Sequence, residues 1–121
     1  MRTTVLLVAI LSTWTVDAFA HAHVRQSTPA DGAVLHSAPS QVVLKLSEPA
    51  RLTAAWIQHG SEPRQKLMPP AQAAQEVTLG LPSLAAGSYV VSWRALSQDG
   101  HVTSGALHFS VVPQAATGAQ P

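Results

Sequence analysis

Hydrophobic and polar residues alternate along three stretches of this chain, a pattern typical of β-strands with one buried face. The stretches are QVVLKLSEP (residues 41–49), GSYVVSWRAL (87–96) and GALHFSVV (105–112). Each is expected to turn its larger apolar side chains toward a core. The inward sets are Val42, Leu44 and Leu46; Tyr89, Val91, Trp93 and Ala95; and Leu107, Phe109 and Val111. The alternation around Trp56 is too weak to assign that ring to either face.

Shorter candidate strands cover residues 24–27, 52–58 and 76–81, with turn-forming residues between them. The expected turns lie at 29–32 (Pro-Ala-Asp-Gly), 47–49, 59–60, 69–70, 86–87 and 99–100. Short strands at this spacing, without a sustained helical period, favour a β-sandwich. We therefore predict an all-β domain.

The N-terminus reads as a cleaved leader rather than as part of the fold. Arg2 precedes a short apolar run, and Ala18-Phe19-Ala20 is a small-residue cleavage motif. An uncleaved anchor is the alternative, but the run is shorter than the roughly 20 residues that a membrane span requires. We predict a signal peptide at 1–20, a domain at 21–112 that begins with His21, and a disordered tail at 113–121.

Composition excludes several classes of function. Without Arg2 and Asp17, the predicted mature chain keeps six of the seven Lys and Arg residues and five of the six Asp and Glu residues. It has no basic stripe, which argues against nucleic acid as a partner. No further segment is apolar enough to span a membrane. The chain lacks cysteine, a Gly-x-Ser-x-Gly motif and a phosphate loop, so hydrolase schemes find no support and a metal would need nitrogen, oxygen or thioether ligands.

The segment QDGHVTSG (98–105) carries the most suggestive chemistry. Asp99 and His101 lie at i and i+2, so in extended backbone their side chains project to the same side and could share a metal ion. The alternative is an ordinary Asp-Gly hairpin turn followed by a solvated histidine.

Leader removal would strengthen the metal interpretation. It would free the α-amine of His21 beside its own imidazole and thus create a two-nitrogen chelate. With one carboxylate and a second imidazole, the set becomes three nitrogens and one oxygen, which suits Cu(II) and, less well, Ni(II); zinc is the obvious competitor. His23 is ambiguous, because a third-position histidine can also bind Cu(II) with the amine and two backbone amides.

At these residues the sequence resembles the CopC family (YobA-type) of exported copper-binding proteins. The resemblance runs from His21 to about Val112 and includes VRQSTPADGAVL, APSQVVLKLSEP and GSYVVSWRALSQDGHVTSGALHFSV. It implies a Greek-key sandwich or barrel of about seven strands, cupredoxin-like or immunoglobulin-like. It also implies one Cu(II) per chain, held by the amine and side chain of His21, by Asp99 and by His101. Some members bind Cu(I) through several methionines, but here the mature chain has only Met68.

The resemblance therefore implies a non-catalytic periplasmic carrier or buffer of Cu(II), serving copper homeostasis or resistance. An inner-membrane transporter of the CopD type is the partner that it suggests. Two alternatives remain: a copper monooxygenase that uses its N-terminal histidine, and a metal-free interaction sandwich. A carboxylate in an equatorial copper position favours storage over oxygen chemistry, so we predict that the protein is not an enzyme.

Overall fold

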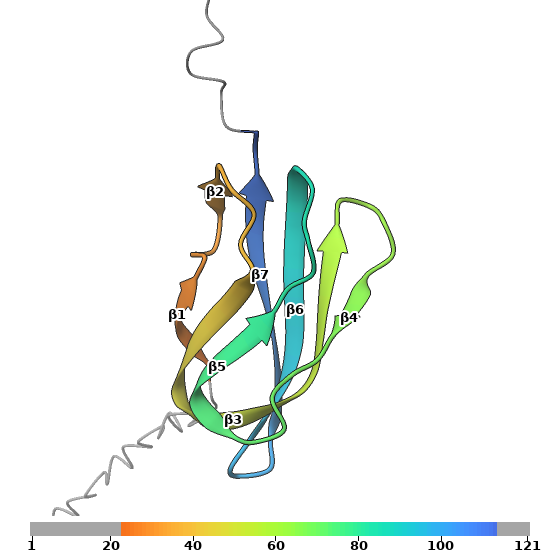
Figure 1. Ribbon diagram of the computed structural model, residues 1–121. Helices are drawn as coiled ribbons and strands as arrows, with labels where there is room; N and C mark the ends of the chain where they lie inside the picture. The colour runs from red at the N-terminus through yellow and green to blue at the C-terminus, as the bar shows by residue number, and fades with distance from the viewer. Residues whose placement is uncertain (1–22, 114–121) are drawn as a thin grey trace, which may run out of the picture.

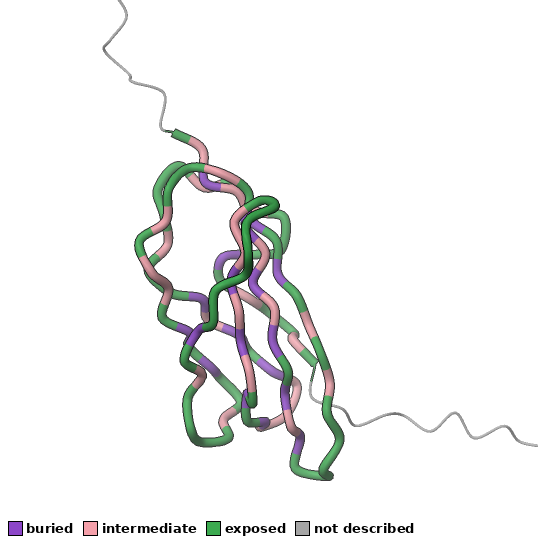
Figure 2. Tube along the Cα trace, turned by 90° about the vertical axis from the view of Figure 1, so that its right-hand side faces the viewer, coloured by how far each residue is buried: buried purple, intermediate pink, exposed green. Residues whose placement is uncertain are grey.

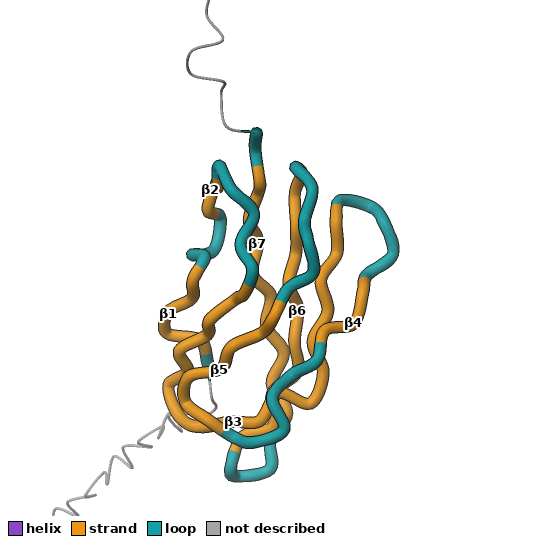
Figure 3. Tube along the Cα trace, viewed as in Figure 1, coloured by secondary structure: helices purple, strands orange, loops and turns teal. Residues whose placement is uncertain are grey.

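Residues 23–113, which the computed structural model describes, fold into strands joined by turns and loops, without a helix (Figures 1 and 3). This confirms the all-β prediction of about seven strands. No membrane-spanning helix occurs among these residues. The predicted leader, His21 and residues 114–121 of the predicted tail lie outside this range. The strands are β1 (Val24–Thr28), β2 (Ala33–Leu35), β3 (Gln41–His59), β4 (Gln65–Leu67), β5 (Ala74–Gly80), β6 (Gly87–Ser97) and β7 (Val102–Val111).

Strand β3 organises the fold because it takes part in both layers. Its first half pairs with β1 and β5, and its second half pairs with β4 and β6. The sequence predicted a turn at residues 47–49, but the strand bends there without reversing (Figure 3). The β3–β5 register shifts between Lys45 and Ala50, which marks a corner where a strand passes from one sheet to the other. Pro49, which has no N–H to donate, is tolerated at such an irregular position.

The remaining strands complete the second layer. β6 pairs antiparallel with β7, and the short β2 adds in parallel at Phe109 to Val111, which gives the order β1-β3-β6-β7-β2.

The predicted inward residues form one core between the layers. Val42, Leu44 and Val91 have no exposed surface, and the other members of the three predicted sets are also buried. Buried and exposed positions alternate along the strands in Figure 2. This single cluster is completed by Ala50, Leu52, Ala55, Ile57, Leu67, Val77 and Leu79. The domain is therefore held together by apolar contacts and strand pairing without a disulfide.

Gly105 makes room for the largest core side chain. A Cβ at this position would lie 2.5 Å from Cζ2 of Trp93, a side chain with only 6% of its surface exposed. Gly105→Ala should therefore lower the free energy of unfolding in urea by about 1–3 kcal/mol, the usual cost of overfilling a core. The control is Gly80→Ala, because a Cβ there meets nothing within 4 Å. Equal losses in the two variants would contradict this explanation.

Two segments that matter for the predicted site lie at the same end of the barrel. The amide of His23 donates to Ser47 Oγ (3.0 Å), and the Ser47 amide donates to the His23 carbonyl (2.8 Å). Three residues beyond Ser47, Ala50 pairs with Ser97, at the start of the turn between β6 and β7. The chain thus reaches β1 next to the corner of β3, at the end where the β6–β7 turn lies (Figure 1).

Candidate metal centre

The turn between β6 and β7 brings Asp99 and His101 together. Gly100 has a positive φ of 86°, and its amide donates to the Ser97 carbonyl (3.0 Å). The amide of Ser97 donates to the His101 carbonyl across the turn (3.0 Å). This is the Asp-Gly turn that the sequence predicted, and glycine suits it because other residues rarely adopt this conformation.

The two side chains project to the same side of the turn. Asp99 Oδ2 lies 2.9 Å from His101 Nδ1, while Oδ1 accepts the backbone N–H of His101 at 3.2 Å. Both side chains are accessible, with 44% of the Asp99 surface and 64% of the His101 surface exposed. The two predicted side-chain ligands from this turn are therefore adjacent and reachable from solvent.

Ser97 supports this pair, and the sequence analysis did not identify it. Its side chain is buried, and its hydroxyl donates to Asp99 Oδ1 while lying 3.1 Å from the His101 carbonyl oxygen. A signal was available: Ser97 continues the inward alternation of Tyr89 to Ala95, so it is a polar residue at a core position. A buried hydroxyl needs a partner, and the Asp99 carboxylate supplies it.

These contacts stabilise the ionised form of Asp99. The pKa of this carboxyl lies well below its usual range, chiefly because of the Ser97 hydroxyl and secondly because of the His101 side chain and amide. The carboxylate is therefore negatively charged throughout the neutral and mildly acidic range. A negatively charged oxygen is the form that binds a cation.

The lowered pKa predicts a pH dependence of stability. A carboxyl whose pKa falls on folding contributes stability above its unfolded pKa of about 3.9, and this contribution is lost as the pH falls toward the folded value. Urea unfolding of the metal-free protein should show a shallower acid decline for Asp99→Asn than for the natural sequence. An equally steep loss of stability with acid in both proteins would show that the contacts of the Asp99 carboxylate do not stabilise the folded state.

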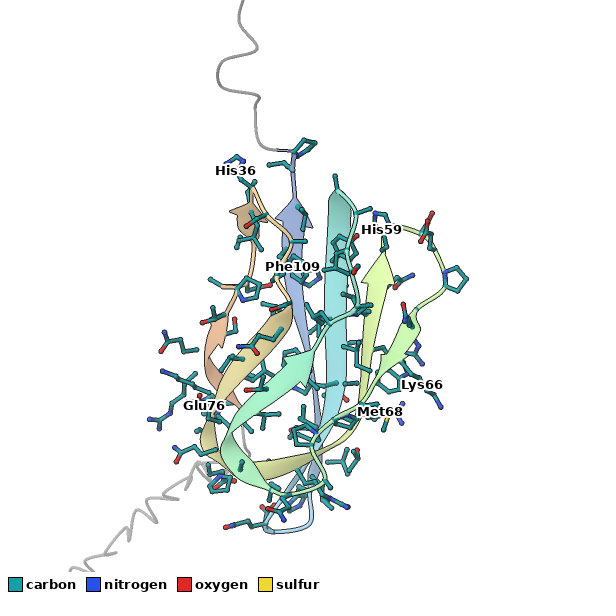
Figure 4. All side chains as sticks on the ribbon, in the orientation of Figure 1. His36, His59, Lys66, Met68, Glu76 and Phe109 are labelled. Carbon is teal, nitrogen blue, oxygen red and sulfur yellow. The ribbon has the colours of Figure 1, made fainter. Side chains whose placement is uncertain are left out.

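Three of the other described histidines, His36, His59 and His108, lie away from this turn. His36 and His59 are at the opposite end of the barrel (Figure 4). His59 stacks on Tyr89, with ring centroids 4.6 Å apart, and its Nδ1 lies 3.5 Å from Glu62 Oε2. His108 lies seven residues along β7 from His101, which is about 23 Å of extended strand.

His108 forms a second Asp–His pair. Its backbone amide donates to Asp31 Oδ1 (2.8 Å), and its Nδ1 lies 3.2 Å from the same oxygen. The backbone hydrogen bond from His108, followed by its side chain, lowers the pKa of Asp31. An Asp–His contact alone therefore does not identify a metal site in this fold. The Asp99–His101 pair differs from the Asp31–His108 pair because its turn lies at the end of the barrel where β1 begins.

Within residues 23–113, no three His, Asp or Glu side chains gather at a potential metal site. The described part of the chain supplies Asp99 and His101, and His21, the third predicted residue, lies outside it. His23 is exposed at the start of β1, and its ligand role stays a prediction.

This chain is similar in sequence to curated proteins. Protein YobA from Escherichia coli (strain K12) is 35% identical over 111 residues, which cover 85% of this chain and 90% of the relative. Protein YobA from Shigella flexneri matches to the same extent.

Two solved structures share the architecture. CopC from Methylosinus trichosporium OB3b is 28% identical, with a TM-score of 0.70 over 80% of this chain and 99% of that one. PcoC from Escherichia coli, described as a methionine-rich copper resistance protein, is 27% identical, with a TM-score of 0.60 over 77% of this chain and 100% of that one. Unlike that methionine-rich protein, this chain has two methionines, Met1 and Met68.

The CopC domain profile matches residues 24–112, from the first residue of β1 to the residue after β7. The match covers well over half of the chain and includes the turn that carries Asp99 and His101. Together with the YobA relatives and the two similar structures, it shows that this chain belongs to the CopC family.

Proposed function

We propose that this protein binds one Cu(II) ion per chain and carries or buffers copper in the periplasm, after removal of residues 1–20. The observation that carries the proposal is the exposed Asp99–His101 pair, held by Ser97 at the end of the barrel where β1 begins. Membership of the CopC family and likeness to a copper resistance protein support it. Copper is the cargo in this role.

The proposed ligands are the amine and imidazole of His21, the Asp99 carboxylate and the His101 imidazole. Residue 21 lies two positions before His23, which is hydrogen-bonded to Ser47 at the corner of β3. Three residues beyond Ser47, the same strand pairs with Ser97. Two residues of chain span at most about 7 Å, so the proposed ligand at position 21 would have to reach the turn from within that distance of His23. Three nitrogens and one oxygen match the tetragonal preference of Cu(II) better than the tetrahedral preference of zinc.

The contacts around Asp99 favour a preformed site. The Ser97 hydroxyl and the His101 amide both donate to Asp99 Oδ1. The other carboxylate oxygen, Oδ2, faces the His101 imidazole on the exposed side of the turn. Hydrogen bonds of this kind orient metal ligands and are costly to lose. Ser97 would therefore position the carboxylate without touching the metal.

One hydrogen bond supports the His21-based ligand set over the alternative copper site built around His23. That arrangement needs the backbone amide of His23 as a ligand, whereas this amide donates to Ser47 Oγ. Binding copper there would break the contact at the start of β1. We therefore place His23 outside the proposed ligand set.

The proposed role is non-catalytic. Asp99 would fill an equatorial copper position that oxygen chemistry requires to be open, which is our reason for preferring transport or storage to the monooxygenase alternative. A CopD-type transporter in the inner membrane is the partner that we propose for copper transfer.

Electron paramagnetic resonance during Cu(II) titration tests the proposal directly. The exported protein should bind one equivalent with a tetragonal signal and splitting from three nitrogens. Saturation at one equivalent with a different nitrogen count would contradict the ligand set. Absence of tight binding would contradict the function itself, and would favour the metal-free interaction sandwich.

A further inference from the structure

A positively charged face lies on the outer side of the second layer, away from the core. It comprises one aromatic and four cationic side chains, which we call the Trp56 face: Arg51, Trp56, Arg64, Lys66 and Arg94. Trp56 is paired with Lys66 of β4 on one side and with Ser92 of β6 on the other, and Arg94 is paired with the neighbouring Ala54. Lys66 points away from the barrel in Figure 4.

This charge is not balanced by nearby carboxylates. The described residues include six Lys and Arg side chains, and four of them are on the Trp56 face. The ion pairs among residues 23–113 all involve histidine, so none neutralises these four cations. The strand segments 50–58, 65–67 and 87–97 contain no Asp or Glu. The loop that carries Arg64 has one carboxylate, Glu62, whose Oε2 lies 3.5 Å from His59 Nδ1. A cationic field therefore covers one side of a nearly neutral protein.

Two guanidinium groups share the same aromatic support. Arg64 Cζ lies 4.2 Å from the centre of a Trp56 ring, and Arg94 Cζ lies 5.7 Å from it. Stacking on an indole restrains a guanidinium but leaves its N–H groups free, and these groups match a carboxylate in a bidentate manner. Both arginines are exposed, whereas Trp56 is half-buried beneath them.

We propose that the Trp56 face docks an acidic segment of a partner protein. Asp or Glu side chains of that segment would bind Arg64 and Arg94, while Lys66 and Arg51 add attraction at longer range. A membrane surface fits less well, because Trp56 is covered by Arg64 and is not available to insert. The face extends toward the β6–β7 turn: Arg94 is three residues from Ser97, which is about 10 Å along a strand.

The test uses metal-free protein, so its result is independent of the proposed copper site. A capped hexaglutamate peptide should shift the NMR signals of the Trp56 indole N–H and of the Arg64 and Arg94 side chains. The affinity should fall as salt is raised, because exposed charges are screened. The double variant Arg64→Gln/Arg94→Gln should weaken binding by about tenfold, as expected for two exposed contacts.

Two further variants separate this site from general attraction. Arg25→Gln removes an exposed cation from β1 in the other layer and should change the affinity less than about twofold. Trp56→Leu keeps every charge but removes the aromatic support, and it should weaken binding by about threefold to fivefold. Circular dichroism would verify that each variant is folded.

Three outcomes would overturn the proposal. One is the absence of shifts at Trp56, Arg64 and Arg94. Another is an equal loss of affinity in Arg25→Gln and the double variant. The third is binding to phosphatidylglycerol vesicles that depends on Arg64 and Arg94 when hexaglutamate does not bind, since the face would then recognise lipid phosphate rather than protein carboxylates.

Discussion

Adding one glycine in front of His21 should weaken Cu(II) binding by more than about a hundredfold. The addition converts the α-amine into an amide and removes one of the three proposed nitrogens. Loss of an outer partner of a metal ligand already costs about 10–100-fold in affinity, so loss of a direct ligand should cost more. Competition against a strong Cu(II) chelator, followed by absorbance, measures the change.

Two controls make this experiment specific. A glycine added after Pro121 alters the length equally and should leave the affinity unchanged. His23→Gln removes the imidazole of the alternative site, which also uses the amine, and it should have little effect if His21 is the ligand. An unchanged affinity after the N-terminal addition would remove the basis of the proposed site.

Asp99→Ala should weaken Cu(II) binding by about 10–100-fold without unfolding the domain. The variant removes the only proposed oxygen ligand, and its copper spectrum should change accordingly. The fold should persist because the side chain is accessible and because the Ser97 hydroxyl retains the His101 carbonyl oxygen 3.1 Å away. The same chelator competition, with thermal unfolding of the metal-free protein, gives both results.

Asp31→Ala is the matched control, because it removes the carboxylate of the other Asp–His pair. Equal losses in the two variants would indicate a general charge effect. Asp99→Asn addresses the alternative role of Asp99 as a hydrogen-bond partner that only orients His101. An amide oxygen could still accept from Nδ1–H, so full affinity in Asp99→Asn would exclude the carboxylate as a ligand.

The alternation of apolar residues predicted the core correctly, because one buried face imposes a two-residue period. The same reasoning failed around Trp56 for a physical reason. A bulge between Leu52 and Ala54 inserts an extra residue, so the inward positions are Leu52 and Ala55, three apart. The outward position of Trp56 follows from this shift, which the sequence pattern did not reveal.

The corner of β3 was also beyond the sequence pattern. Ser47, Glu48 and Pro49 are typical of a chain reversal, and the same residues suit a bend between two sheets, so composition cannot separate the two. For the candidate site, the i, i+2 spacing predicted that Asp99 and His101 project to the same side, and the two side chains do meet. They meet in a turn around Gly100, which has a φ of 86°, and not in the extended backbone that the prediction assumed. This spacing did not identify Ser97, although the inward alternation of β6 marks it as a polar residue at a core position. Its partner, the Asp99 carboxylate, became evident only from the geometry of the turn.

The dual role of β3 links the start of the domain and the β6–β7 turn in one cooperative unit. Its first half holds β1, next to the predicted N-terminus, and its second half holds β6, which leads into Asp99 and His101. A ligand that joins these two segments would bind the native state and not the unfolded chain, so it would raise the melting temperature of the whole barrel with increasing concentration. In the proposed export, the first residues of the mature chain would remain without their ligand partners until the β6–β7 hairpin had folded, so metal binding would indicate that folding is complete.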